Sequence, residues 1–275
     1  MSSRRLLVST LLFLSPVWFF PSAANAAGAA VSLEDLTWTE LRERIAGGTT
    51  TILVPIGGTE QNGPAMALGK HNVRVRFLAE KIAERLGNAL VAPVLAYVPE
   101  GSIDPPTAHM KFPGTITIGD KVFEQVLESA ARSFKLHGFK TIVLLGDHGG
   151  YQANERAVAD RLNGEWRKTP VRVLASTEYY QITQGAYVAQ LLSAGAKQAE
   201  IGTHAGLADT SLMLAIDPSL VRRDRLAAGP KPTAADGVYG GDPTRSSAEF
   251  GQIGVDLIVS GTAKAIQDFV GKQPK

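Results

Sequence analysis

The chain contains no cysteine among its 275 residues. It therefore has no disulfide bonds, no thiol nucleophile and no thiolate metal ligand, so any metal ion must be held by His, Asp and Glu side chains. The sequence also lacks a long run of charges of one sign, an internal repeat and a low-complexity linker. Hydrophobic residues make up 44% and charged residues 20%, a globular composition with enough apolar area for a full core.

The first 26 residues have the pattern of a signal peptide. Ser3-Arg4-Arg5 precedes an apolar stretch at 6–20, and Ala24-Asn25-Ala26 matches the small-x-small cleavage pattern. The stretch is short for a membrane span, which needs about 20 residues, so we expect cleavage rather than an uncleaved anchor. The two arginines also leave twin-arginine export open. The sequence thus predicts a periplasmic or secreted protein, with residues 27–275 forming a single domain.

Cleavage changes what the charge balance means. The 28 basic residues, less the two arginines of the signal segment, equal the 26 acidic ones, so the mature chain has no net charge. The basic character of the precursor therefore gives no reason to expect nucleic acid, or a membrane after cleavage, as a partner. We expect a small-molecule substrate instead.

Short apolar strands alternate with helical patterns along the mature chain. Strands are predicted at 51–56, 89–95, 140–145 and 171–175, and helices at 72–86, 120–137, 153–166 and 248–269. Continuously apolar strands separated by helices indicate a mostly parallel sheet covered on both faces, a three-layer α/β/α fold. Ligands of such sheets bind beyond the carboxyl ends of the strands, which directs attention to residues 57–62 and 146–150.

Polar side chains follow both of these strands. Glu60 lies in a glycine-rich turn after the first, and His71 precedes the next helix, so the two can converge; a surface turn capped by Asn72 is the alternative. Asp147 and His148 end the other strand and are followed by two glycines, which let backbone approach a ligand closely. This context favours a site role for His148 over a purely structural one.

Two further segments carry candidate residues. His204 and Asp209 can reach the same cleft, although a helix N-cap followed by a core helix also explains this segment. His109 comes shortly before a Pro-Gly turn and is predicted to line the site.

Together these segments resemble the creatininase (creatinine amidohydrolase) family. The matching elements are a Gly-rich string containing Glu-Gln, a Phe-Pro-Gly-Thr element, a Gly-Asp-His-Gly-Gly element, a His-Ala-Gly string ending in Asp-Thr-Ser, and Gly-Asp-Pro. They stand at 57–71, 112–115, 146–150, 204–211 and 241–243. Their order and spacing agree over nearly the whole mature chain.

The resemblance implies a dinuclear hydrolase, but this chain departs from the family pattern at the ligands. Glu60 and His148 match, whereas Asn62 replaces a ligand histidine and His71 replaces the aspartate that bridges two metals. Imidazole is a poor bridge because its two nitrogens point in divergent directions. The remaining set of Glu60, His71 and His148 predicts one divalent metal, zinc foremost, with manganese or iron as alternatives. Asn62 then lines the site rather than binding metal.

The activity implied is hydrolysis of a non-peptide C–N bond in a cyclic or linear amide by a metal-activated water. His204 is the candidate for proton transfer to the leaving nitrogen, and Asp147 is the candidate for supporting His148. The resemblance also implies a homo-oligomer, a hexamer. A lactonase on the same metal, and a non-catalytic periplasmic binding protein that has lost its metals, are the alternatives.

Overall fold

The computed structural model describes residues 30–227 and 230–272, so the expected signal peptide lies outside the described residues. Four strands, β1 (Thr51–Ile56), β2 (Ala89–Val91), β3 (Thr141–Gly146) and β4 (Arg172–Ala175), form one parallel sheet in the order β2-β1-β3-β4. β1 and β3 pair over their full lengths, so their carboxyl ends lie at the same level. The predicted parallel sheet is confirmed.

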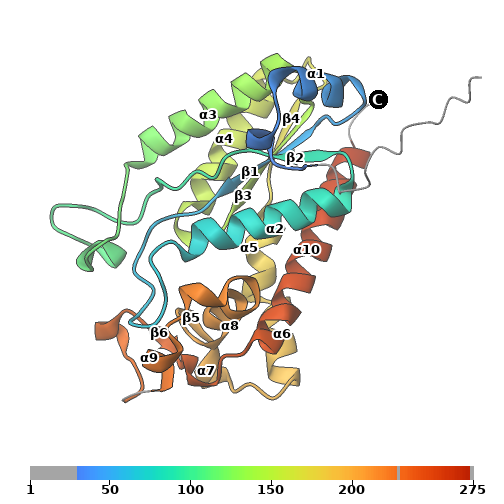
Figure 1. Cartoon of the computed structure of the whole chain (residues 1–275). Helices are drawn as coiled ribbons and strands as arrows, with labels where there is room; N and C mark the ends of the chain where they lie inside the picture. Colours follow the sequence, from blue (N-terminus) through green and yellow to red (C-terminus); the bar gives the residue numbers. More distant parts are fainter. Residues whose placement is uncertain (1–29, 228–229, 273–275) are drawn as a thin grey trace, which may run out of the picture.

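Helices cover both faces of this sheet (Figure 1). One face carries α1 (Trp38–Ala46), α3 (Asp120–His137) and α4 (Gln152–Glu165); the other carries α2 (Lys70–Leu86), α5 (Thr177–Gln184) and α10 (Ala248–Gly271). Successive strand residues point to opposite faces. Ile52 and Ile142 therefore pack under α3 and α4, whereas Leu53 and Val143 pack under α2 and α10. This is the expected three-layer α/β/α arrangement.

A smaller group of elements lies at the lower end of Figure 1. It comprises α6 (Ala186–Ser193), α7 (Gln198–Ile201), β5 (Gly202–His204), α8 (Leu207–Ile216), α9 (Arg223–Ala227) and β6 (Tyr239–Gly241). β5 and β6 pair antiparallel through His204 and Tyr239, and α8 packs along α10. This packing brings His204 and Asp209 towards the ends of the strands. Short 3₁₀ turns occur at Leu33–Asp35, Ala108–Lys111, Gly149–Tyr151, Pro218–Leu220, Ala234–Asp236 and Pro243–Arg245.

Most boundaries lie within one residue of the sequence prediction; the larger differences are in β2, α2 and α10, which ends at Gly271 rather than 269. β2 ends at Val91 rather than 95 because Pro93 has no N–H to donate to the sheet, although Leu95 still forms an isolated bridge to Ile56. α2 begins at Lys70, two residues earlier than predicted, and ends at Leu86 as predicted, followed by Gly87 in the left-handed conformation. The early start places Lys70 and His71 on the first turn of α2.

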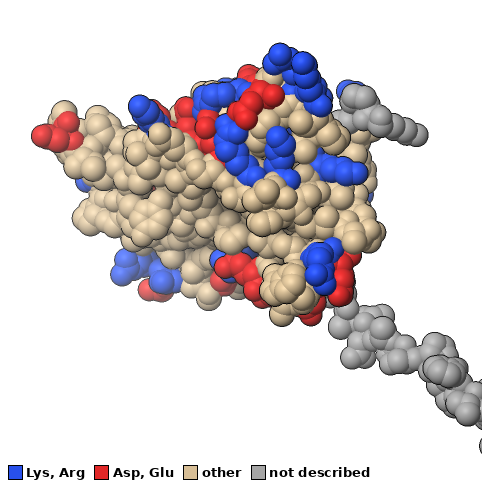
Figure 2. All heavy atoms as spheres, turned by 90° about the horizontal axis from the view of Figure 1, so that it is seen from above, with Lys and Arg blue, Asp and Glu red and all other residues tan. Residues whose placement is uncertain are grey.

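Charged side chains of both signs are mixed on the face seen in Figure 2, next to a broad area without charges. Among the helices of the described ranges, none combines the length and apolar character that a membrane crossing requires.

Candidate metal centre

The site is built at the carboxyl ends of β1 and β3. Glu60 follows β1 after the turn at 57–59, and Asp147 and His148 follow β3 directly. Because the two strands end in register, these side chains meet as the sequence indicated. Glu60 is completely buried, and its two carboxylate oxygens face different sets of neighbours.

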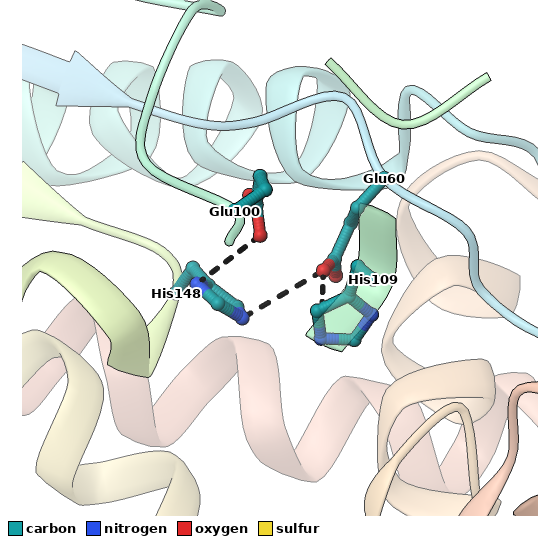
Figure 3. A group of neighbouring side chains, drawn as sticks. All are labelled: Glu60, Glu100, His109 and His148. Atoms are coloured by element: carbon teal, nitrogen blue, oxygen red, sulfur yellow. Dashed lines mark ion pairs between the residues drawn. The ribbon is translucent and has the colours of Figure 1, made fainter. Parts of the chain in front are cut away.

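The Oε2 side of Glu60 faces His109, His148 and Glu100 (Figure 3). His109 Nε2 lies 3.2 Å and His148 Nε2 3.7 Å from Glu60 Oε2, and His148 Nδ1 lies 3.8 Å from Glu100 Oε2. Glu60 Oε2 and both oxygens of Glu100 have no hydrogen-bond partner among the described residues. One donor atom from each of the four side chains lies within 4.8 Å of the others. We call these four residues the metal group.

Glu100 reaches the metal group because Gly58 leaves room for it. Gly58 has φ 146°, and a Cβ at this position would lie 2.6 Å from Glu100 Oε1. A side chain at position 58 would therefore displace the Glu100 carboxyl.

The ionisation of the metal group suits a cation. Burial and the neighbouring Glu60 raise the pKa of Glu100 to about 9, while burial lowers the pKa of His148 to about 4 and also lowers that of His109. At pH 7 both imidazoles are therefore neutral, and each has one lone pair. Each Nδ1 also faces a donor within the protein: the Gly150 N–H at 3.2 Å from His148 and the Gln61 amide nitrogen at 3.0 Å from His109. Three buried carboxyl oxygens without hydrogen-bond partners, Glu60 Oε2 and both oxygens of Glu100, and two neutral imidazoles are a donor set that a divalent ion completes, so these residues fit a metal.

The Oε1 side of Glu60 is occupied by side chains. His71 Nε2 lies 2.6 Å from Glu60 Oε1, His204 Nδ1 lies 3.6 Å away, and Lys70 Nζ lies 3.9 Å away. Glu60 Oε1 therefore has partners within the protein, in contrast to Glu60 Oε2.

Asp147 lies behind His71 and is fully paired. Its carboxylate accepts from His71 Nδ1 at 2.5 Å, from Arg74 Nε at 2.8 Å and from the Tyr179 hydroxyl at 2.7 Å. Burial alone raises the pKa of Asp147, but the charge of Arg74 and the hydrogen bond from His71 outweigh burial and hold the pKa below its usual value. No side-chain contact joins Asp147 to His148 among the described residues, so its predicted support of His148 has no direct geometric basis.

Asp209 is paired in the same way. It accepts from Lys70 Nζ at 3.0 Å, from Arg74 Nη1 at 2.7 Å and from the Ala205 N–H at 2.9 Å. Burial opposes ionisation, but the charges of Lys70 and Arg74 hold the pKa of Asp209 well below its usual value.

One cavity of about 210 Å³ adjoins these groups. The predicted site residues that line it are His71, His109, Asp147, His148, His204 and Asp209. Asn62 does not line this cavity, because its amide nitrogen donates to the backbone carbonyls of Glu60 and Ala67 at 2.8 and 3.1 Å. The predicted ligand His71 has both nitrogens against carboxylates, so its ligand role stays a prediction that this geometry does not favour.

Sequence reasoning missed Glu100, Lys70 and Arg74. Lys70, His71 and Arg74 share the start of α2, whose first turn contains no acidic residue. Cationic side chains at a helix N-terminus are unfavourable against the helix dipole, so this pattern was a detectable signal of acidic partners elsewhere. Glu100, in a loop of no regular pattern, offered no such signal.

Comparison with known proteins identifies the family. The family model described as creatinine amidohydrolase matches residues 34–266. Creatinine amidohydrolase from Pseudomonas putida is 27% identical over 258 residues, covering 87% of this chain and 97% of the relative. The mycofactocin precursor peptide peptidase of Mycolicibacterium smegmatis is 29% identical over 236 residues, covering 78% of this chain and 84% of the relative.

Solved structures agree with this assignment. A crystal structure of creatininase has a TM-score of 0.74 and 26% identity, covering 90% of this chain and 100% of its own. A structure named "Creatininase Mn" has a TM-score of 0.73 and 27% identity, covering 88% and 99%. A mutant creatininase of "Zn-Zn type" has a TM-score of 0.71 and 28% identity, covering 88% and 98%. The chain belongs to the creatininase family and is a metal-dependent amidohydrolase.

Proposed function

We propose that this chain hydrolyses the C–N bond of a small cyclic or linear amide at a divalent ion held by the metal group. The observation that carries this proposal is the three buried, unpartnered oxygens, Glu60 Oε2 and both of Glu100, beside two neutral imidazoles. Zinc is the ion we expect foremost, because two imidazoles and carboxylates suit it; manganese is the alternative that a relative's name supports.

A divalent ion at this position supplies Lewis acidity and lowers the pKa of water from about 16 towards 7. The chain's own residues supply proton transfer. His204 Nε2 lies 2.9 Å from the backbone carbonyl of Gln61, which only accepts, and 3.2 Å from the Gln61 amide nitrogen, which only donates. The shorter contact favours the proton on Nε2 and the lone pair on Nδ1. Burial, with the nearby charge of Lys70, lowers the pKa of His204 to about 3. His204 is therefore neutral at pH 7, and its Nδ1 would accept the proton that the attacking water releases and pass it to the leaving nitrogen.

The size of the cavity favours a small substrate. Its volume of about 210 Å³ is below the range of roughly 300–1,000 Å³ that drug-sized ligands occupy. Tyr180, Gln184 and Tyr239 add polar groups to its wall. The P. putida relative is named for a small amide and the M. smegmatis relative for a peptide. Of these two substrate classes, the small amide fits the cavity.

A substrate panel with metal removal tests this function. Small cyclic amides, linear amides, lactones of matching ring size and short peptides are assayed before and after chelation, and again after Zn²⁺ or Mn²⁺ is restored. We expect metal-dependent turnover of small amides, and a fall in kcat of about 10²–10⁴-fold for His204→Ala. His137→Ala, an exposed histidine at the end of α3, is the control. Amide turnover that survives complete chelation, or turnover of lactones alone, would contradict the proposal.

We also propose that the protein is exported and that it is a homo-oligomer. The basic start, the apolar stretch at 6–20 and the Ala24-Asn25-Ala26 pattern support export. Mass spectrometry of the protein from its native compartment should give an N-terminus at Ala27. Light scattering of the purified protein tests the hexamer. A cytoplasmic protein that keeps Arg4, or a monomer, would contradict these two proposals.

A further inference from the structure

Three cationic side chains enter the site from the start of α2. Lys70, His71 and Arg74 are 0%, 3% and 4% exposed, and we call them the cationic cluster. Buried charges of this kind persist only with partners of opposite charge. Their partners are the buried carboxylates of Glu60 and Asp147 and the partly buried carboxylate of Asp209.

His71 offers no lone pair to a metal. Its Nε2 lies 2.6 Å from Glu60 Oε1 and its Nδ1 lies 2.5 Å from Asp147 Oδ2. A carboxylate oxygen only accepts, so the ring donates from both nitrogens. Arg74 Nη2 also lies 3.1 Å from Nδ1 of His71, which places two donors next to each other. Asp147 accepts from both side chains, and these hydrogen bonds offset the unfavourable contact.

The cationic cluster closes the Oε1 side of Glu60. The two ions of a dinuclear site lie about 3.5–4 Å apart and rely on shared ligands. Here the oxygen available for sharing, Glu60 Oε1, already has His71 at 2.6 Å and Lys70 at 3.9 Å. A second divalent ion next to it would face the Lys70 ammonium and the N–H that His71 directs at Oε1. The other carboxylates nearby, Asp147 and Asp209, are neutralised by Arg74 and Lys70.

We propose that this chain binds a single metal ion and that Lys70, His71 and Arg74 take the place of the second ion. The inference rests on the proposed function, because the first ion is that of the metal group. In this arrangement His71 is a positioning residue: its hydrogen bonds hold Glu60 so that Oε2 faces His109 and His148.

Metal stoichiometry tests the inference without relying on activity. The full mature chain is loaded with Zn²⁺, dialysed and analysed by elemental analysis, and the affinity is measured by titration calorimetry. We expect one ion per chain. His71→Gln should still bind one ion at saturation, with an affinity lowered by no more than about 10–100-fold, the range for groups that only orient a ligand. The matched variant His148→Ala, in which a proposed ligand is removed, should not retain a stoichiometric ion.

A second variant tests directly whether these side chains exclude a second ion. Lys70→Ala combined with His71→Asp removes both basic side chains that face Glu60 Oε1 and adds a carboxylate. It also removes Lys70 as a partner of Asp209, so that the Asp209 carboxylate can bind an ion. It should raise the capacity from one ion to two. Lys81→Ala, at an exposed lysine of α2 paired with Glu84, should leave it at one. Thermal unfolding with and without Zn²⁺ verifies that each variant folds.

The outcomes separate the two proposals. Two ions in the wild-type chain would overturn this inference and leave the proposed function intact. Loss of the ion in folded His71→Gln, equal to that in His148→Ala, would also overturn it by making His71 a ligand. A folded Lys70→Ala/His71→Asp variant that still binds one ion would overturn it too, since the cations would not be what excludes the second. No ion in the wild type would instead overturn the proposed function, and this inference with it.

Discussion

Glu100 and Asp147 are buried to the same extent, at 3% exposure each, yet they are opposite kinds of carboxyl group. Asp147 accepts hydrogen bonds from His71, Arg74 and Tyr179, and its pKa is lowered. Glu100 has no partner for either oxygen, and its pKa is raised to about 9. Burial opposes ionisation in both, so the partners decide the direction of the shift.

The same contrast divides the two sides of Glu60. The side that faces Asp147 is complete within the protein, with every charge paired. The side that faces Glu100 has unpartnered oxygens and neutral imidazoles, and needs a cation from outside. A paired carboxylate is therefore part of the scaffold, whereas an unpartnered one among other donors indicates a binding site.

Breaking the paired side should have the largest effect on stability. Arg74→Met leaves the buried Asp147 and the partly buried Asp209 without their guanidinium partner. We expect a loss of about 3–5 kcal/mol in the free energy of unfolding, the usual result of removing one partner of a buried ion pair. Urea unfolding of the metal-free protein measures it. Arg132→Met, which removes the exposed pair with Glu165, is the control and should change stability little. Equal effects of the two variants would show that burial does not set the energetics of these pairs.

Glu155 is a buried carboxyl group without a partner that lies away from the metal group, so it tests what the lack of a partner does in the absence of other metal ligands. It is 1% exposed, its Oε1 has no partner, and burial raises its pKa to about 8, but it lies outside the metal group. Between pH 4.5 and 8 the folded protein keeps a proton that the unfolded chain has lost, so stability falls as pH rises through this window. The maximum slope is about 1.4 kcal/mol per pH unit.

Glu155→Gln removes this slope. Relative to the wild type, the variant should gain up to about 2–3 kcal/mol between pH 6 and pH 8, measured by urea unfolding of the metal-free proteins. Its metal content should not change. Glu43→Gln, at an exposed position of α1, is the control. A stability difference that stays constant with pH would mean that Glu155 is ionised in the folded protein.

Glu100→Gln tests the unpartnered side itself. The amide keeps the shape of the carboxyl but cannot release a proton and become a carboxylate ligand, so Zn²⁺ affinity should fall by about 10–100-fold. Competition with a chromophoric chelator measures the affinity, and Glu165→Gln, an exposed carboxylate, is the control. An unchanged affinity in Glu100→Gln would remove Glu100 from the metal group.

The fold was predictable because its signals are local and periodic. The helix predicted at 120–137 is α3 with the same bounds, and the strand at 51–56 is β1. Apolar period and flanking glycines mark such elements in any single sequence. The boundaries of β2 and α2 were less accurate because a proline and a glycine N-cap shift an end by a few residues.

The site was predictable only where it follows a strand. Glu60 and His148 were placed correctly at the strand ends because parallel strands carry their ligands there. Glu100 could not be placed, because its approach depends on the space left by Gly58, some forty positions earlier in the chain. The pairing of His71 with Asp147 was equally hidden, since it joins residues 76 positions apart.

Asn62 gives the smallest expected effect. It occupies a position at which the family resemblance places a ligand histidine, yet its amide nitrogen donates to two carbonyls of the loop after β1. Asn62→Ala should cost about 1–2 kcal/mol in unfolding free energy, because the buried carbonyl of Glu60 and the partly buried carbonyl of Ala67 lose a donor. Its metal content should match the wild type, because no contact joins its side chain to the carboxylate of Glu60. Elemental analysis of Asn62→Ala and Glu100→Gln side by side compares their metal contents directly, since both residues are buried and neither was a predicted ligand. Loss of the ion in Asn62→Ala, with full affinity kept in Glu100→Gln, would reverse the assignment: the family position would bind metal, and the unpartnered carboxyl would be structural.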